Sequence, residues 1–294
     1  MSGFSTAWLD ARYRADEAAR NPETEAAVWS MCSGIQPLRV LDLGAGTCAA
    51  FRHLAPRGPA RQRWTALEQD PLLLGAAQQL LPGWAAGAGY TAGPDAGGWA
   101  FRSSSQALHL RMIGGDLHSG AAWEAAGPQD LIVAHALLDL CSAEQLRALA
   151  ARISGQAQGL YALLNYTGMR AWPQMPEDGA VFGWYEAHMQ RPQPFGRACG
   201  REAPAVLREA FAALGWQVRS GVSRWVLGPG EQAMHAFLLG FMEQSIPEMA
   251  EGPGGLALFR RWLAARRAQS QAGQLTLDVE HEDLLAAAHG LLPG

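Results

Sequence analysis

The stretch that decides the fold is "VLDLGAGTCA", residues 40–49. Its apolar start is compact enough for a buried strand and too short for a helix. Gly44 and Gly46 then interrupt the chain, and "TCAAFRHLA" (47–55) continues as a helix. A strand, a glycine turn and a helix in this order can cradle a nucleotide cofactor, and Gly44, Gly46 and Ala49 satisfy the relaxed pattern G-x-G-x-x-G/A.

Strand and helix patterns alternate on both sides of this stretch. Compact apolar runs predict strands at 38–43, 63–68, 107–116, within 129–138 and at 159–166. Helical patterns between and after them cover 47–55, 71–81 and 142–153, the last opened by a capping box of Ser142 and Gln145. This alternation predicts an α/β fold with a Rossmann-like, doubly wound, mostly parallel sheet.

The flanking segments are expected to complete a single domain over residues 1–294. Two helices, at 6–20 and 23–34, predict an N-terminal helical cover over 1–36. The later patterns predict helices at 203–215, 230–249 and 255–270, a strand at 216–227, and a last strand within 274–288 that runs into a short helix. The last strand is expected to return to the same sheet and to be antiparallel.

The same patterns divide the domain into functional parts. Residues 38–166 form the expected cofactor-binding core, and 229–270 a helical insertion before the last strand. Residues 83–105 are rich in glycine and serine and indicate a surface loop. Residues 167–200 follow the fifth strand and are dense in aromatics, arginine and proline, so they predict a substrate-side insertion, since ligands bind at the carboxyl ends of parallel strands.

Composition excludes several function classes. The chain has 23 Lys and Arg residues against 27 Asp and Glu, a net charge of −4, and all 23 basic residues are arginine. The absence of lysine excludes Schiff-base chemistry and a Walker-type phosphate loop. The acidic balance argues against a nucleic-acid partner. No apolar run could span a membrane, and the charged N-terminus does not read as a signal peptide, so a cytoplasmic protein is expected. The four cysteines are scattered, and no metal site is expected.

Three carboxylates separate the possible cofactors. Asp42 lies at the strand end in "LDLGAG", where a nicotinamide-binding fold is usually apolar. Glu68 closes the second strand in "ALEQD" and can accept hydrogen bonds from ribose hydroxyls, which both cofactor classes have. Asp116 follows the third strand in "IGGDLHSG" and is expected beside an adenine. Asp42 and Asp116 together favour S-adenosylmethionine.

The stretches "VLDLGAGTCAAFRHL", "ALEQD", "GGDL", "DLIVAHALLDL" and "LYALLNY" resemble the successive motifs of class I S-adenosylmethionine-dependent methyltransferases. They occur in that family's order across roughly residues 38–166. The last strand also suits the family, whose sheet ends in an antiparallel hairpin. One position departs from the pattern, because Cys48 stands where the family often has a third glycine.

The resemblance implies the cofactor S-adenosylmethionine and a role for each matched residue. Glycines 44 and 46 would approach the methionine part, Asp42 would orient the turn, Glu68 would hold the ribose, and Asp116 would flank the adenine. The implied cofactor-binding residues are Asp42, Gly44, Ala45, Gly46, Glu68, Gln69, Asp70, Asp116, Leu117, Ala134 and His135. The N-terminal helix is expected to fold over the cofactor, with Tyr13, Arg14 or Arg20 near its carboxylate.

Methyl transfer from a sulfonium is an in-line displacement, which depends on attack geometry and, for some acceptors, on a general base. His188, in "WYEAHMQR", is the first candidate base, and His135 is the second. The side chains expected to bind a small-molecule acceptor are Tyr166, Trp184, Tyr185, Arg191, Phe195 and Arg197. Arginines there would favour an anionic acceptor. Two alternatives stay open: a nicotinamide-dependent oxidoreductase and a non-catalytic, methyltransferase-like binding protein.

Overall fold

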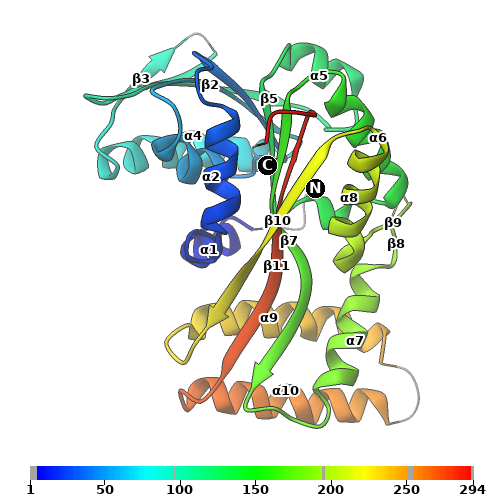
Figure 1. The fold of residues 1–294 in the computed structure, drawn as a ribbon. Coiled ribbons are helices and arrows are strands. Elements are labelled where there is room, and N and C mark those ends of the chain that lie inside the picture. The colour runs from blue at the N-terminus through cyan, green and yellow to red at the C-terminus, as the bar shows by residue number, and fades with distance from the viewer. Residues whose placement is uncertain (1–4, 96, 194–195, 251–253, 293–294) are drawn as a thin grey trace.

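A nine-stranded sheet runs through the computed structural model (Figure 1), which describes residues 5–95, 97–193, 196–250 and 254–292. Its centre consists of five parallel strands, in the order β5 (Ala107–Gly114), β2 (Arg61–Glu68), β1 (Leu38–Leu43), β6 (Leu131–His135) and β7 (Gly159–Trp172). The chain starts at the centre with β1, moves outward through β2 and β5, and returns to the other side through β6. This is the expected doubly wound arrangement, and the predicted fold class is confirmed.

Antiparallel strands extend the sheet at both edges. β11 (Thr276–Ala287) pairs with β7 on one side and with β10 (Gln217–Leu227) on the other, so the sheet ends in an antiparallel hairpin. At the opposite edge, β4 (Gly98–Arg102) pairs with β5 and with β3 (Thr91–Asp95). The expected short helix after the last strand is wrong: Leu284–Ala287 stay extended because they are buried and paired on both sides.

The loop expected at 83–105 is also wrong. Helix α4 (Pro71–Gly87) continues past its predicted end, and the hairpin β3–β4 fills the rest. Phe101 explains the hairpin, because its side chain is buried against Phe51 and Trp84, with ring centroids 5.3 and 5.6 Å away. The prediction failed because the high glycine content of this stretch indicated a loop, although the stretch also contains these buried aromatic residues.

Helices cover both faces of the sheet, and alternate strand residues point to the two faces. Val40 packs in one apolar core with the helices α1 (Thr6–Ala19), α2 (Pro22–Met31), α3 (Ala49–Leu54) and α4. Leu41 packs in the other core with α5 (Gly120–Ala126), α6 (Ala143–Ser154) and α8 (Ala203–Ala213). Burial on both faces explains why "LRVLDL" is a nearly continuous apolar run.

The two N-terminal helices begin at capping side chains. Ser5 accepts a hydrogen bond from the Trp8 amide at 3.2 Å, and Asn21 accepts one from the Thr24 amide at 2.9 Å. Trp8 anchors α1, since its ring packs on Trp225 of β10. The cover is therefore attached to the C-terminal hairpin of the sheet.

Long strands carry the second half of the chain away from the sheet's centre. In Figure 1, β7, β10 and β11 extend down to α9 (Gln232–Ser245) and α10 (Gly255–Gln271). Within residues 167–200, the expected substrate-side insertion, β7 continues to Trp172 and α7 (Asp178–Met189) follows. The buried Arg266 of α10 fixes α7, because its guanidinium donates to Asp178 at 2.5 Å.

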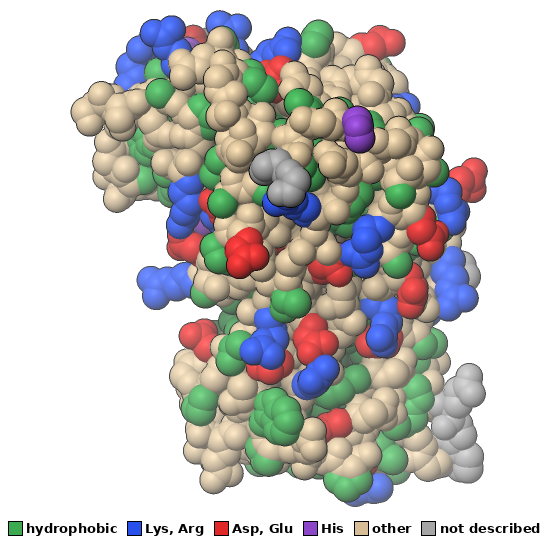
Figure 2. All heavy atoms as spheres, in the orientation of Figure 1, with side chains coloured by type: hydrophobic (Ala, Val, Ile, Leu, Met, Phe, Trp, Pro, Cys, Tyr) green, Lys and Arg blue, Asp and Glu red, His purple; other side chains and the backbone are tan. Residues whose placement is uncertain are grey.

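The surface carries both signs of charge. Figure 2 shows basic side chains in blue interspersed with acidic side chains in red over one face of the molecule. In the described part of the chain, no helix combines the length and the apolar character that a bilayer crossing requires. All four cysteines are buried and unpaired with one another.

Candidate functional site

The turn after β1 is held in a glycine-dependent conformation. Gly44, Gly46 and Cys48 have φ values of 60°, 54° and 60°, in the left-handed region that glycine adopts without strain. The Ala45 amide donates to the Leu67 carbonyl at 3.0 Å, and the Gly46 amide donates to the Glu68 carboxylate at 2.8 Å. These bonds join the turn to the end of β2, the strand next to β1.

Asp42 is a buried carboxylate that has no partner among the residues the structure describes. It is 1% exposed, and neither of its side-chain oxygens has a hydrogen bond to them. Burial raises its pKa well above the ordinary value, and the nearby Glu68 carboxylate adds to this effect. A buried polar group without a partner costs a few kcal/mol (~1–3). Such a group marks a place where a ligand or an ordered water completes the structure. The residues at this turn therefore fit a polar cofactor.

Glu68 organises the end of β2. One carboxylate oxygen accepts the Gly46 amide, and the other accepts the Asp70 amide at 2.9 Å. Each oxygen keeps a second lone pair, so the carboxylate can still receive ribose hydroxyls. Asp70 caps α4, because it accepts the Leu72 amide at 2.9 Å, and Gln69 is exposed.

Asp116 and Leu117 lie at the end of the next strand, β5. The Asp116 carboxylate accepts the His118 amide at 2.8 Å, and the Leu117 carbonyl accepts the Trp123 indole N–H at 2.7 Å. Gly115 donates to the Glu68 carbonyl at 3.0 Å, so this loop and the end of β2 are joined. The predicted acids Asp42, Glu68 and Asp116 thus lie at the carboxyl ends of three neighbouring strands.

Two leucines cover the turn. A Cβ added to Gly44 would lie 2.9 Å from the methyl carbons of Leu137, and one added to Gly46 would lie 3.6 Å from a methyl carbon of Leu9. Leu9 comes from α1 and Leu137 from the loop after β6. We call the turn 44–48, Asp42, Glu68 and Asp116 the cradle.

A buried polar cluster lies under α1, beside Ala134 and His135 at the end of β6. Asp16 is 1% exposed; it accepts hydrogen bonds from Arg12 at 2.9 Å and from the Trp225 indole at 3.1 Å. The His135 ring nitrogen Nε2 lies 3.8 Å from the Asp16 carboxylate. Burial lowers the pKa of His135 well below its ordinary value, with help from Arg12, so His135 is a neutral neighbour of this cluster.

Tyr13, Arg14 and Arg20 of the N-terminal cover, which were expected near the cofactor's carboxylate, have different surroundings. Arg14 is exposed, and Arg20 pairs with Glu25 at 2.8 Å. Tyr13 stacks on the His53 ring with centroids 4.0 Å apart, and the Arg52 guanidinium lies 4.0 Å from the Tyr13 ring centre. The arginine of α1 that lines the cavity is Arg12. In the sequence, the only sign of its role was its position four residues before Asp16, with which it pairs.

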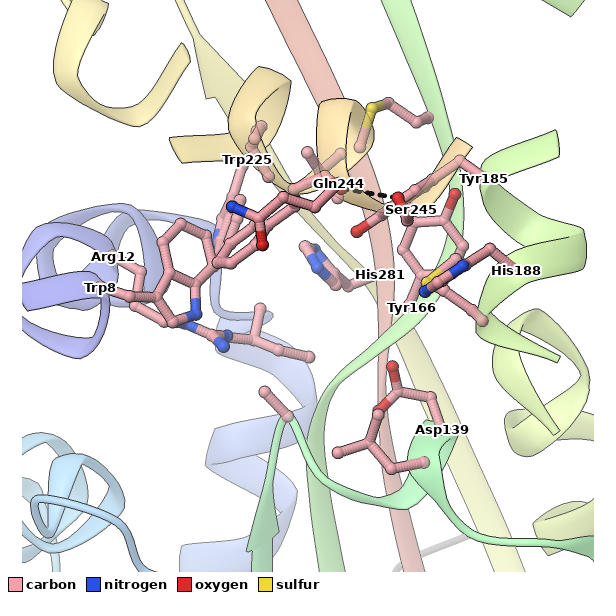
Figure 3. Close-up of a pocket in the computed structure, with 18 residues that line it drawn as sticks. Trp8, Arg12, Asp139, Tyr166, Tyr185, His188, Trp225, Gln244, Ser245 and His281 are labelled. Atoms are coloured by element: carbon pink, nitrogen blue, oxygen red, sulfur yellow. Dashed lines mark hydrogen bonds between the residues drawn. The ribbon is translucent and has the colours of Figure 1, made fainter. Parts of the chain in front are cut away.

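A cavity of about 480 Å³ lies beside the cradle (Figure 3). Its walls come from α1, the loop after β6, β7, α7, β10, α9 and β11. The lining residues are Trp8, Arg12, Ala136, Asp139, Leu140, Leu164, Tyr166, Met169, Tyr185, His188, Met189, Trp225, Leu238, Phe241, Gln244, Ser245, Val279 and His281. In Figure 3, Asp139, Gln244, Trp8 and Tyr185 surround the same space from different sides.

The cavity includes strained backbone. Ala136 and Leu164, which both line it, have φ values of 50° and 52°. Non-glycine residues in this region cost about 1–3 kcal/mol each and persist where the surroundings hold them. Asp283 holds Leu164, because its carboxylate accepts the Leu164 amide at 2.8 Å. Strain of this kind is common at functional sites.

The polar side chains of the cavity have shifted pKa values. Burial raises the pKa of Asp139, in the short helix η2 (Leu138–Leu140), to about 6, and its Oδ1 has no partner. Burial and then the Asp139 charge raise the pKa of Tyr185 to about 12. Burial lowers the pKa of His281 to about 3, and burial and Arg191 lower that of His188.

The structure brings together only some of the predicted acceptor residues. Tyr166, Tyr185 and His188 line the cavity, while Trp184 does not. Two predicted arginines lie outside it: Arg191 pairs with Glu248, and Arg197 donates to Gln190 at 2.8 Å. Phe195 lies outside the described residues.

Sequence reasoning missed Asp139, His281, Trp8 and Trp225. Asp139 had a signal, since it follows the fourth strand. The other three did not, because α1, β10 and β11 meet only in the folded chain. Across the described ranges, no three side chains of His, Cys, Asp or Glu are grouped to hold a metal ion.

The cradle and the cavity share two walls. In α1, Leu9 covers Gly46, whereas its neighbour Trp8 lines the cavity. In the loop after β6, Leu137 covers Gly44, whereas its neighbour Ala136 lines the cavity. A ligand on the turn and a ligand in the cavity would therefore be adjacent.

The sheet ends in the antiparallel hairpin β10–β11, which the sequence resemblance led us to expect. No family model matches the chain. No curated protein sequence matches it.

Solved structures of similar shape include three proteins. The cyclopropane synthase MmaA2 from Mycobacterium tuberculosis is 12% identical, with 94% of each chain covered and a TM-score of 0.45. A cyclopropane-fatty-acyl-phospholipid synthase-like protein from Lactobacillus casei is 16% identical, covering 94% of this chain and 98% of that one, with a TM-score of 0.48. An S-adenosylmethionine-dependent methyltransferase from Thiobacillus denitrificans, solved with S-adenosylhomocysteine, is 14% identical. The match covers 95% of this chain and 97% of that chain, with a TM-score of 0.43. All three TM-scores are below 0.5, so the residues of the site carry the functional inference.

Proposed function

We propose that this protein transfers a methyl group from S-adenosylmethionine to a small-molecule acceptor by in-line displacement. The observation that carries the proposal is the buried carboxylate of Asp42, which has no partner among the described residues, lies two residues before Gly44 and is near the Glu68 carboxylate. A cofactor with an ammonium group and ribose hydroxyls offers the donors that these two carboxylates can accept.

The proposed roles follow the strand ends. Glu68 accepts the ribose hydroxyls, and Asp116 and Leu117 flank the adenine. Asp42 receives the ammonium group, directly or through water. S-adenosylmethionine supplies a methyl group on a sulfonium, which is already a good leaving group. The protein then has to hold the acceptor atom in line with the breaking bond between sulfur and the methyl group. The cavity can do this, because its wall at Ala136 is adjacent to the cradle.

Calorimetric titration with S-adenosylhomocysteine tests the proposal. Wild-type protein should bind, and Glu68→Gln should bind about tenfold to a hundredfold more weakly, because a hydrogen bond to a charged group contributes roughly 1.5–3 kcal/mol. Glu124→Gln makes the same charge change on the exposed face of α5 and should bind like wild type. Thermal unfolding of each variant checks that it is folded.

The same titration separates the alternatives. Binding of NADH in place of S-adenosylhomocysteine would favour the nicotinamide-dependent oxidoreductase and would contradict the proposal. Binding of S-adenosylhomocysteine without turnover of any acceptor in a broad screen would favour the non-catalytic binding protein.

A further inference from the structure

The cavity carries one carboxylate and no uncompensated cation among the described side chains that line it. Its single acid is Asp139, and its single permanent cation is Arg12. Arg12 is neutralised by Asp16, because Nε and Nη2 both donate to that carboxylate, at 2.9 and 3.1 Å. The guanidinium is also held between Trp8 and Trp225, at 5.6 and 5.0 Å from the ring centres.

The histidines of the cavity do not compensate Asp139. Burial lowers the pKa of His281 to about 3, and burial together with Arg191 lowers the pKa of His188. Both rings are therefore neutral at physiological pH. The phenol of Tyr185 also stays neutral, since burial and Asp139 raise its pKa to about 12.

Five aromatic rings line the cavity beside aliphatic and neutral polar side chains. They belong to Trp8, Tyr166, Tyr185, Trp225 and Phe241. Trp8 packs on Trp225 and Phe241 with ring centroids 5.9 and 5.0 Å apart, so this part of the wall is rigid. Aromatic faces attract organic cations and accommodate an apolar body.

We propose that the methyl acceptor is an apolar amine, whose nitrogen binds beside Asp139 while its organic body packs among the five rings. This inference rests on the proposed function. An acidic acceptor would place a second negative charge beside Asp139 with no free arginine to balance it. The arginines that favoured an anion, Arg191 and Arg197, do not line the cavity.

Transfer of the methyl group to the amine releases one proton to solvent. The acceptor enters as an ammonium ion and gives one proton to the Asp139 carboxylate, which leaves a neutral amine. The nitrogen lone pair forms the new N–C bond as the S–C bond of the sulfonium breaks, and the bonding electrons stay on sulfur. The product leaves as a methylammonium ion, and Asp139 releases its proton to solvent.

Calorimetry with three probes of matched size tests the acceptor class. Protein saturated with S-adenosylhomocysteine is titrated with 2-phenylethylamine, 2-phenylethanol and 3-phenylpropionate. The amine should bind about tenfold to a hundredfold more tightly than the alcohol, and the carboxylate most weakly. Asp139→Asn should remove the preference for the amine over the alcohol. The control Glu124→Gln, which removes an exposed carboxylate, should keep it.

A second measurement needs no variant. In wild-type protein the amine should bind more weakly below about pH 6, as Asp139 becomes protonated, and the alcohol should lose much less affinity over the same range. The other titratable or charged groups around Asp139 are Arg12 of α1, Cys141 after η2, Tyr166 of β7, Tyr185 and His188 of α7, and His281 of β11. Of these, His281 has a pKa near 3, and Tyr185 one near 12, so neither titrates in this range.

Several outcomes overturn the inference. They are an absence of amine binding, equal binding of alcohol or carboxylate, and an amine preference that survives Asp139→Asn. Each leaves the proposed function intact as long as S-adenosylhomocysteine binds. Failure of S-adenosylhomocysteine itself to bind would instead overturn the proposed function.

Discussion

Among the described residues, several buried polar atoms without partners lie at the cradle and around the cavity. Both carboxylate oxygens of Asp42 lack a partner, and so does one side-chain atom each of Asp139, His188, His281 and His135. Burying such groups destabilises the fold, and active sites are where proteins tolerate that destabilisation. At the scale of single residues, stability and function are therefore expected to oppose each other.

Asp139→Asn tests this opposition. Because burial raises the pKa of Asp139 from 3.8 to about 6, the folded protein binds this proton more tightly than the unfolded chain. The resulting stability is present below about pH 4 and is lost as the pH rises through about 6, by on the order of 3 kcal/mol. The variant should melt higher than wild type at pH 7.5 and equally at pH 4. A difference that does not change with pH would contradict this assignment.

Gly44→Ala tests the turn. Alanine at φ 60° is strained by about 1–3 kcal/mol, and its Cβ would lie 2.9 Å from the Leu137 methyl carbons. We expect weaker S-adenosylhomocysteine binding and a lower melting temperature. Gly75→Ala is the matched control, because its Cβ meets no atom within 4 Å, and helix propensity should stabilise it by up to about 1 kcal/mol. A tolerant Gly44→Ala variant would count against the described turn.

Asp283 shows how elements are joined to build the site. Its buried carboxylate accepts the Asn21 amide before α2 and the Leu164 amide of β7, at 2.9 and 2.8 Å. It also accepts the Ser223 hydroxyl of β10 at 2.7 Å. This single side chain on β11 therefore connects the N-terminal cover, the strained cavity wall and the last hairpin.

Asp283→Ala should lower the free energy of unfolding by roughly 3–5 kcal/mol, because three buried donors lose their acceptor. Urea denaturation measures the loss. Glu209→Ala, at an exposed position of α8, should stay within about 0.5 kcal/mol of wild type. Equal stability of the two variants would show that Asp283 does not join these elements.

The sequence predicted those parts of the fold and of the site whose structure is decided by residues close together along the chain. The parallel strands β1, β2 and β6 were predictable, and so were the acids Asp42 and Glu68. The reason is that a buried parallel strand and a glycine turn are local sequence patterns. The hairpin β3–β4 and helix α7 were not, because Phe101 and Asp178 are anchored by Trp84 and Arg266 from other parts of the chain. The cavity was largely hidden for the same reason, since its walls come from seven separate segments.

On the scale of the whole molecule, helix α1 of the N-terminal cover adjoins both the cradle and the cavity. Helix α1 covers the turn with Leu9, lines the cavity with Trp8, and packs on β10. We expect a ligand in the cradle to contact Leu9 of the cover and Leu137 of the loop after β6. Binding at the cradle should therefore change the stability of the cavity walls that the cradle shares.

Hydrogen exchange tests this coupling. S-adenosylhomocysteine should slow exchange in the turn 44–48, in α1 and in residues 135–140. The hairpin β3–β4, at the far edge of the sheet, should exchange at an unchanged rate. Protection confined to the turn would show that the cover does not take part, and protection of the hairpin would place the ligand elsewhere.

The most direct test of the central claim is a crystal structure of the protein grown with S-adenosylhomocysteine. We predict its ribose hydroxyls within hydrogen-bond distance of Glu68, its amino group near Asp42, and its sulfur facing the cavity at Ala136. Density for the ligand at another surface, or a well-ordered cradle without ligand at saturating concentration, would contradict the account.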